Sequence, residues 1–197
     1  MTFLRLKWWQ PPAFGLAAIL LSATAVFAQG GTLAEKIQLC GTCHGEDGNS
    51  KTEKTPSLAG QPAFYILNQL FLMREGVRKV EPMAAIVKDL KDSDLDGLSK
   101  HYSALAPKRS DEKYDRSLSP RGLAVVAERR CGSCHLPGLV GQQQIPRIAK
   151  QRIDYLIQTL KSFRDNPRGG ADTAMSAPVA GMSDDDVQAL AHYLWSR

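Results

Sequence analysis

Two copies of one pentapeptide constrain this chain more than any other feature of its sequence. The first copy runs from Cys40 to His44 and the second from Cys131 to His135, and both read Cys-x-x-Cys-His. Two cysteines three residues apart project from nearly the same face of a helical turn. Both thiols can therefore add to the vinyl groups along one edge of a porphyrin, while the His that follows meets the iron.

This pattern is the signature of covalent c-type haem attachment, and we predict two haem c groups. A redox dithiol would need no His and would favour a βαβ context. A zinc ion shared by the two cysteine pairs, or a disulfide framework, would leave the duplicated His unexplained. The predicted attachment residues are Cys40, Cys43, Cys131 and Cys134, and the predicted iron ligands next to them are His44 and His135.

The first 28 residues have the pattern of a secretory signal. Arg5 and Lys7 precede an apolar run from Phe14 to Ala28, which ends in small residues before Gln29. The run is shorter than the roughly 20 residues that cross a bilayer as a helix, although an uncleaved anchor remains the alternative. We therefore expect a cleaved signal peptide at 1–28 and a periplasmic protein. The formal net charge of +5 is too small to indicate a nucleic-acid partner.

The rest of the chain is a tandem duplication with an offset near 90 residues. Continuing the register past the shared motifs pairs Met83 with Met175. Methionine is a soft donor that suits the sixth position of haem iron, so we predict that these two residues are the second axial ligands, with ordinary core packing as the alternative. Met73 and Met182 are interpreted as packing residues. Further matched pairs are Pro56 and Pro146, Gln61 and Gln151, Tyr65 and Tyr155, Arg74 and Arg164, and Arg78 and Arg168.

Two histidines outside the motifs are further candidates for axial ligands. His101 and His192 do not share a repeat position, because His101 aligns with Tyr193 and His192 with Lys100. A ligand should have duplicated together with its haem. Both are therefore interpreted as residues of a helix surface or boundary, and bis-His ligation in one lobe stays open.

The pattern of apolar residues predicts an all-α fold with helices around each motif. Helices are expected at 62–74 and 152–163, and a final helix in each lobe is expected to begin at the N-caps Ser93 and Ser183. The charged segment 107–120 has no periodicity and is predicted to be a linker. The expected domains are therefore 29–106 and 121–197.

These residues resemble the dihaem cytochrome c4 family, in which two class I cytochrome c domains lie in tandem. The resemblance rests on Cys-His-Gly-x-Asp-Gly-Asn-Ser at 43–50, Pro-x-Leu-Ala-Gly-Gln at 56–61, Tyr65, Arg-x-Gly-x-Arg at 74–78 and the Met-x6-Leu pattern that starts at Met83. It covers essentially all of 29–197. The second lobe departs from it at Leu136-Pro137 and at Lys150, which stands where the first lobe has glycine. In the first lobe, His101 occupies a position that is usually aromatic.

The resemblance implies a ligand set for each haem: His44 with Met83, and His135 with Met175. It also implies that the carbonyls of Pro56 and Pro146 accept the Nδ1 protons of the two ligand histidines. The arginines of the repeat are predicted to neutralise haem propionates, with the lobe interface or a solvated helix end as alternatives. They are Arg74, Arg78, Arg164 and Arg168.

Iron with protein ligands on both axial sides has no open position for a substrate, so we expect an electron carrier and not an enzyme. The resemblance implies a cytochrome bc complex and a terminal oxidase as redox partners, with peripheral membrane association possible. One alternative is the cytochrome subunit of a flavocytochrome c sulfide dehydrogenase, whose partner is a flavoprotein. A dihaem enzyme, such as a thiosulfate dehydrogenase or a peroxidase, is a less favoured alternative. A thiolate ligand for such an enzyme is excluded as long as both motifs use all four cysteines.

Overall fold

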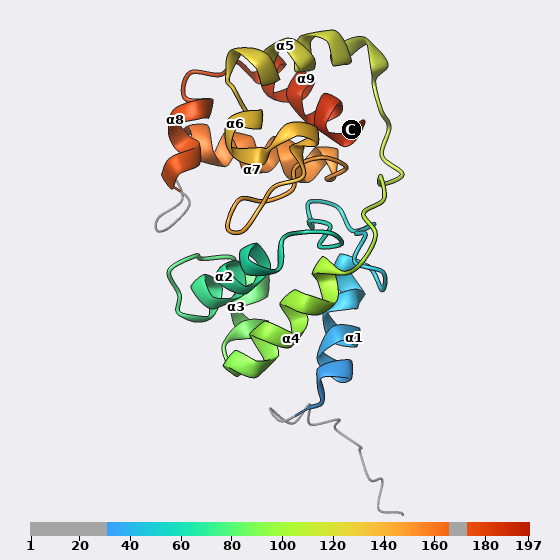
Figure 1. Cartoon of the computed structure of the whole chain (residues 1–197), viewed down its shortest axis with the longest axis vertical. Coiled ribbons are helices and arrows are strands. Elements are labelled where there is room, and N and C mark those ends of the chain that lie inside the picture. The colour runs from blue at the N-terminus through green and yellow to red at the C-terminus, as the bar shows by residue number, and fades with distance from the viewer. Residues whose placement is uncertain (1–30, 166–172) are drawn as a thin grey trace, which may run out of the picture.

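A computed structural model of the chain describes residues 31–165 and 173–197 (Figure 1). The predicted signal peptide at 1–28 and Arg168 lie outside these residues. Within the described ranges the regular structure is helical, apart from one isolated antiparallel bridge between Gln142 and Ile145. The predicted all-α fold is therefore confirmed. No helix in the described part of the chain is long and apolar enough to cross a membrane.

The helices fall into two groups that lie end to end in Figure 1. The first lobe contains α1 (Leu33–His44), α2 (Ala63–Arg74), α3 (Glu81–Val87) and α4 (Asp92–Ser103). The second lobe contains η1 (Arg116–Leu118), α5 (Ser119–Glu128), α6 (Gly132–His135), η2 (Pro137–Leu139), α7 (Ile153–Asp165), η3 (Thr173–Met175), α8 (Ser176–Val179) and α9 (Asp184–Trp195). The helices expected at 62–74 and 152–163 thus correspond to α2 and α7.

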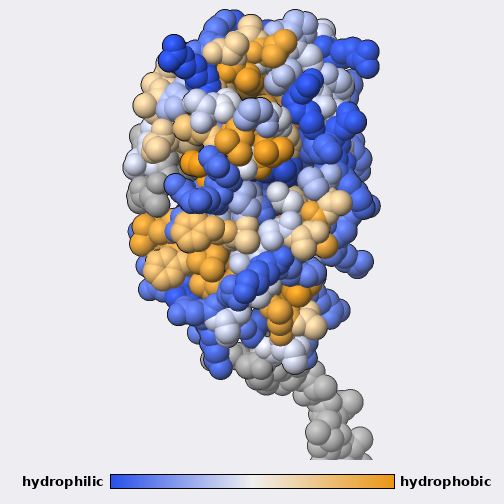
Figure 2. Space-filling model, viewed as in Figure 1, coloured by the Kyte–Doolittle hydropathy of each residue, from blue (hydrophilic) through white to orange (hydrophobic). Residues whose placement is uncertain are grey.

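Each lobe has its own apolar core. Ile66, Leu70 and Leu98 belong to the buried cluster of the first lobe, and Leu156, Leu160 and Leu190 belong to that of the second. The chain joins the two lobes along one side of the molecule (Figure 1). Helical structure resumes at Arg116, inside the segment that was expected to be the linker. Figure 2 shows several apolar areas among the hydrophilic ones on this face, and one of them lies over α2, where Phe64 and Phe71 are exposed.

The helix starts follow from local capping. Thr32 and Glu35 form a reciprocal capping box at α1, and the Ser183 hydroxyl accepts a hydrogen bond from the Asp186 N–H at α9. The prediction that Ser93 caps α4 is wrong, because this helix already begins at Asp92. There the Asp94 carboxylate accepts a hydrogen bond from the backbone N–H that precedes the helix, at 2.9 Å.

In each lobe the first and last long helices pack closely. In the first lobe, a Cβ atom on Gly97 of α4 would lie 2.8 Å from a methyl group of Leu33 on α1. In the second lobe, a Cβ atom on Gly122 of α5 would lie 2.3 Å from the carbonyl oxygen of Ala189 on α9. Glycine therefore allows both helix crossings. It lies on the last helix of the first lobe, but on the first long helix of the second lobe.

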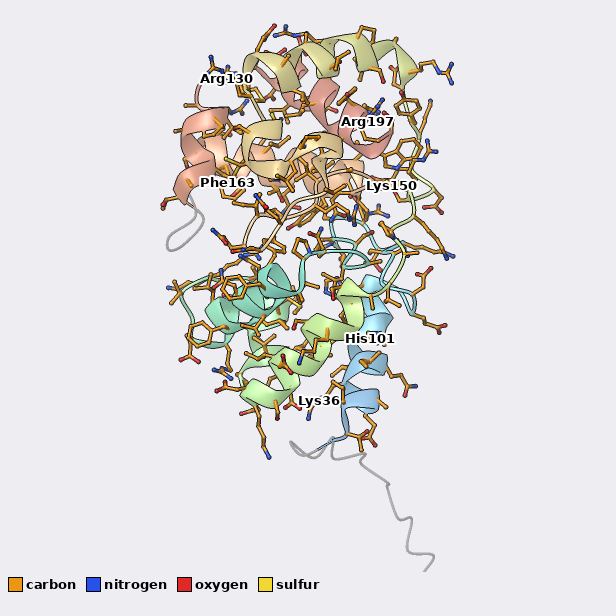
Figure 3. The ribbon with its side chains drawn as sticks, in the orientation of Figure 1. Lys36, His101, Arg130, Lys150, Phe163 and Arg197 are labelled. Atoms are coloured by element: carbon orange, nitrogen blue, oxygen red, sulfur yellow. The ribbon has the colours of Figure 1, made fainter. Side chains whose placement is uncertain are left out.

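The haem-attachment motifs sit in different local structure in the two lobes. In the first lobe the motif is the last part of the continuous helix α1. In the second lobe α5 ends at Glu128, Arg130 has a φ of 52°, and the short helix α6 carries the second Cys and the His (Figure 3). α5 therefore does not continue into the second motif, because Arg130, just before the motif, has its backbone in the left-handed region and separates α5 from α6.

Candidate haem sites

The two motif histidines occupy equivalent buried positions. His44 ends α1 and His135 ends α6, and they are 6% and 4% exposed. The Nδ1 atom of His44 lies 2.8 Å from the carbonyl oxygen of Pro56, and the Nδ1 atom of His135 lies 2.7 Å from that of Pro146. These are the contacts that the family resemblance implied for the two prolines. A carbonyl partner fixes the proton on Nδ1 and orients the Nε2 lone pair away from it.

The protonation of these rings suits iron. Burial lowers the pKa of His44 and of His135, although the hydrogen bonds to the proline carbonyls act in the opposite direction. Both rings are therefore neutral at physiological pH. The Nε2 atom of His135 is buried and has no hydrogen-bond partner within the described residues. An orphaned buried nitrogen normally costs free energy, and coordination to haem iron removes that cost, so the residues present fit the group.

The cysteines are arranged for attachment rather than for redox or zinc chemistry. None of the four forms a disulfide; Cys40 and Cys131 are half-buried, whereas Cys43 and Cys134 are exposed. Burial raises the pKa of Cys40 and of Cys131, which is the opposite of the lowered pKa that a redox dithiol needs. Among the described residues, no group of three or more His, Cys, Asp or Glu could hold a metal ion. The two cysteine pairs therefore do not form a shared zinc site.

Met83 and Met175 lie in short helical segments and pack against the same cores as an attachment cysteine of their lobe. Met83 is in α3 and packs, together with Cys40, against the core of the first lobe. Met175 ends η3 and packs, together with Cys131, against the core of the second. Both are partly exposed, whereas Met73 and Met182 are 8% and 3% exposed. The interpretation of the latter two as packing residues is confirmed.

The two remaining histidines differ in surroundings. His192 accepts a hydrogen bond at Nδ1 from the backbone N–H of Asp115, 3.0 Å away, which ties α9 to the connecting segment. His101 lies on α4 (Figure 3), where its ring makes an edge contact with Tyr102. Its Nε2 atom is buried without a hydrogen-bond partner among the described residues. Neither arrangement repeats in the other lobe, as the sequence register implied.

Arg74 and Arg164 make the same contacts in the two lobes. Arg74 donates to Asp92 at 2.8 Å and to the carbonyl of Leu90 at 3.0 Å. Arg164 donates to Asp184 at 2.7 Å and to the carbonyl of Met182 at 2.8 Å. Each arginine thus fastens the long middle helix of its lobe to the start of the last helix.

These partners favour a fastening role over the predicted contact with propionates, which stays a prediction for both Arg74 and Arg164. Arg78 donates to Gln69 within the first lobe, and its propionate contact likewise stays a prediction.

The residues that join the lobes are not among those predicted from the sequence. Arg147 is 4% exposed and donates through Nη2 to the carbonyl of Ala59, 2.8 Å away. Burial lowers the pKa of Arg147 to about 10. Gln61 and Gln151 both reach across to the opposite lobe. Their match in the internal repeat was visible in the sequence, but a shared position does not reveal that the contact crosses between lobes.

Comparisons with known proteins place these features in a family. Residues 119–197 match the family model described as cytochrome c. A cytochrome c4 of Pseudomonas aeruginosa is 32% identical over 170 residues, covering 81% of this chain and 84% of the relative. A thiosulfate dehydrogenase electron acceptor of Stutzerimonas stutzeri is 30% identical over 200 residues, covering 92% of each. The crystal structure of reduced recombinant cytochrome c4 from Pseudomonas stutzeri superimposes with a TM-score of 0.74 and 28% identity, covering 85% of this chain and 99% of that one.

The fold, the two motifs and these likenesses define a c-type cytochrome with two covalently bound haem groups, one for each class I cytochrome c domain. Such a protein transfers electrons. Within that class, the chain belongs to the cytochrome c4 family. The resemblance, the two-domain fold and the haem c cofactors expected from the sequence are thereby confirmed.

Proposed function

We propose that the protein carries single electrons between redox proteins in the periplasm, with His44 and Met83 ligating the first haem iron and His135 and Met175 the second. When bound, haem supplies a one-electron Fe(III)/Fe(II) couple. The observation that best supports this proposal is the repeated site geometry. In both lobes a buried neutral histidine donates Nδ1–H to a proline carbonyl, and a methionine packs with the attachment cysteine against the same core.

The proposed location and domain boundaries follow from the sequence. Residues 1–28 would direct export and be removed, and haem would be attached after export. The domains would be 29–106 and 121–197, joined by 107–120. A mature N-terminus at Gln29, measured by mass spectrometry of the periplasmic fraction, would support both the cut and the location. An intact leader retained with membranes would contradict them.

A carrier of this kind needs a donor and an acceptor. A cytochrome bc complex as donor and a terminal oxidase as acceptor are the partners that we propose first, because the family resemblance of the sequence implies them. Two axial protein ligands at each iron would leave no position for a substrate, so the protein would not itself be an enzyme. Cyanide should therefore leave the spectrum of the oxidised protein unchanged at first contact, and rapid binding to one haem would revive the enzyme alternative.

A second candidate is the electron acceptor of a thiosulfate dehydrogenase. It is favoured by the relative of that name, which aligns over 92% of both chains. Stopped-flow mixing with a thiosulfate dehydrogenase and thiosulfate distinguishes the two candidates. If the thiosulfate dehydrogenase reduces the protein faster than a cytochrome bc complex does, the second candidate is favoured. The flavocytochrome alternative would be favoured instead if a flavoprotein co-purified with the chain.

The experiment that tests the central proposal is a redox titration of the purified mature protein, with haem counted by pyridine haemochrome absorbance. We expect two haems per polypeptide, two one-electron waves, and a far-red absorption band from Met-to-ferric-iron ligation that both haems contribute to. A colourless protein, a single haem, or the absence of the far-red band would overturn it.

A further inference from the structure

Two glutamines make reciprocal hydrogen bonds across the boundary between the lobes. The side-chain amide of Gln151 accepts from the Ser57 N–H at 2.8 Å and donates to the Ser57 carbonyl at 3.0 Å. The side-chain amide of Gln61 accepts from the Arg147 N–H at 2.9 Å and donates to the Arg147 carbonyl at 2.9 Å. Gln61 and Gln151 are a matched pair of the internal repeat, so the two contacts are related by the pseudo-symmetry of the molecule.

The residues that receive these bonds adjoin the histidine partners. Ser57 follows Pro56, so its N–H belongs to the same peptide group as the Pro56 carbonyl that faces His44. Arg147 follows Pro146 in the same way, and the Pro146 carbonyl faces His135. Each motif histidine is therefore connected, through one peptide group, to a glutamine of the other lobe.

Both connections are sealed from water. Ser57, Gln61, Arg147 and Gln151 are 2%, 3%, 4% and 3% exposed. Hydrogen bonds in series polarise one another, most of all where water does not screen them. A peptide whose N–H is held by an amide oxygen has a more electron-rich carbonyl, which accepts the Nδ1 proton of a histidine more strongly. A stronger Nδ1 hydrogen bond makes the imidazole a more basic metal ligand.

We propose that Gln151 tunes the haem of the first lobe and Gln61 tunes the haem of the second, each acting through the peptide that holds the opposite lobe's histidine. Both glutamines are positioning residues, since neither touches a haem ligand directly. The inference rests on the proposed His44 and His135 ligation. A more basic histidine favours ferric iron, so each glutamine lowers the reduction potential of the haem across the boundary.

The test is a redox titration of the intact dihaem protein carrying Gln151→Met, which keeps the side-chain length and removes both hydrogen bonds to Ser57, together with the one that Oε1 accepts from the Arg152 N–H at 2.9 Å. We expect the loss of this polarisation to shift the ferric-to-ferrous equilibrium toward ferrous iron by about two- to fourfold. That change raises the reduction potential by about 20 to 35 mV, at 59 mV per tenfold for a one-electron couple.

We expect the potential of the first haem to show this rise in Gln151→Met and that of the second haem to rise less. In Gln61→Met we expect the second haem to show the larger rise. The two waves are assigned beforehand with Met83→His and Met175→His, each of which lowers the potential of its own haem.

Two further variants separate tuning from packing. Gln158 of α7 is exposed, and Gln158→Met serves as the matched control that moves neither potential. Gln151→Glu keeps an oxygen acceptor for the Ser57 N–H, so the potential of the first haem should stay at or below that of the unmodified protein. If both substitutions at Gln151 raise it equally, or if the shift appears in the haem of the substituted lobe, the proposal is wrong.

A second readout is amide hydrogen exchange. Protection of the Ser57 N–H should fall in Gln151→Met, and protection of the Arg147 N–H should fall in Gln61→Met. The far-red band reports the ligand set itself. If the reduction potentials of the glutamine variants are unchanged and the far-red band is intact, only the tuning proposal is wrong. If the unmodified protein has no far-red band, the proposed axial ligands are wrong.

Discussion

Gly60 and Lys150 occupy equivalent turns, one in each lobe, and both have backbone in the left-handed region. Their φ angles are 66° and 56°. Gly60 donates its N–H to the carbonyl of Tyr102 on α4, and Lys150 donates its N–H to that of Leu194 on α9, each at 3.0 Å. The turn therefore fastens the same helix in both lobes, whichever residue occupies it. Figure 3 shows Lys150 at the boundary between the lobes.

Lys150→Gly should stabilise the second lobe by about 0.5 kcal/mol. Relief of a left-handed conformation gains about 1–2 kcal/mol, and the greater backbone freedom of glycine in the unfolded chain takes back about 0.5–1 kcal/mol. The measurement is the free energy of unfolding by denaturant titration. Lys150→Ala is the control, because it removes the side chain and keeps the strain, and it should change stability by less than the glycine variant does.

The reverse substitution in the first lobe should be costly. A Cβ atom on Gly60 would lie 2.9 Å from Cδ of Pro107 in the connecting segment. Gly60→Ala should therefore destabilise the first lobe by about 2–3 kcal/mol, from backbone strain together with this close contact. A loss below about 0.5 kcal/mol would show that the turn and Pro107 can separate freely.

Gly122→Ala should disrupt the crossing of α5 and α9. The added Cβ would lie 2.3 Å from the Ala189 carbonyl oxygen and 2.4 Å from Cβ of Tyr193, and neither is the end of a flexible side chain. We expect a loss of about 1–3 kcal/mol by thermal unfolding, despite the gain in helix propensity of about 1 kcal/mol. A variant as stable as the unmodified protein would contradict the close crossing.

The ion pair between Lys36 and Asp94 should make the first lobe sensitive to acid. The Nζ atom of Lys36 lies 2.9 Å from Oδ1 of Asp94, and the two side chains are 18% and 12% exposed. Burial tends to raise the pKa of Asp94, but the hydrogen bonds from Lys36 and from the N–H of Lys91 outweigh it and hold that pKa below its ordinary value. A carboxyl group with a lowered pKa stabilises the fold above its unfolded pKa of about 3.9, and this contribution is lost as the pH falls through the folded value.

Lys36→Met should therefore cost about 1–2 kcal/mol at pH 7, and the difference from the unmodified protein should shrink below about pH 4. Denaturant unfolding at pH 7 and at pH 3 measures both values. Lys100→Met is the control, because the Lys100–Asp96 pair is largely exposed and should contribute less than about 0.5 kcal/mol. A loss that is the same at both pH values would show that Lys36 acts by packing alone.

The sequence predicted much of this molecule because its strongest signals are local. The spacing of Cys40, Cys43 and His44 reports one helical turn, and the apolar periodicity of 62–74 reports one helix. The start of α4 could not be read in the same way, because the helix begins at Asp92 and its first turn is closed by Asp94, whose carboxylate accepts from the Lys91 N–H and also bonds to Lys36 on another helix. The contacts of Gln61, Gln151 and Arg147 depend on how the two lobes meet, which no periodicity within one lobe records.

Met83→Ala and Met73→Ala should separate an axial ligand from a core residue of the same type in the same lobe. Met73 is 8% exposed and belongs to the buried cluster, so its truncation should cost about 2–5 kcal/mol of stability and leave the far-red band intact. Met83 is partly exposed, so its truncation should cost less packing energy while removing the first haem's share of that band and lowering the potential of that haem. Absorption spectra of the oxidised proteins and their redox titrations measure both effects.

A far-red band that is unchanged in Met83→Ala would assign the sixth position of the first haem to another side chain. His101 would then be the residue to substitute next, because its Nε2 atom is buried without a partner in the described part of the chain.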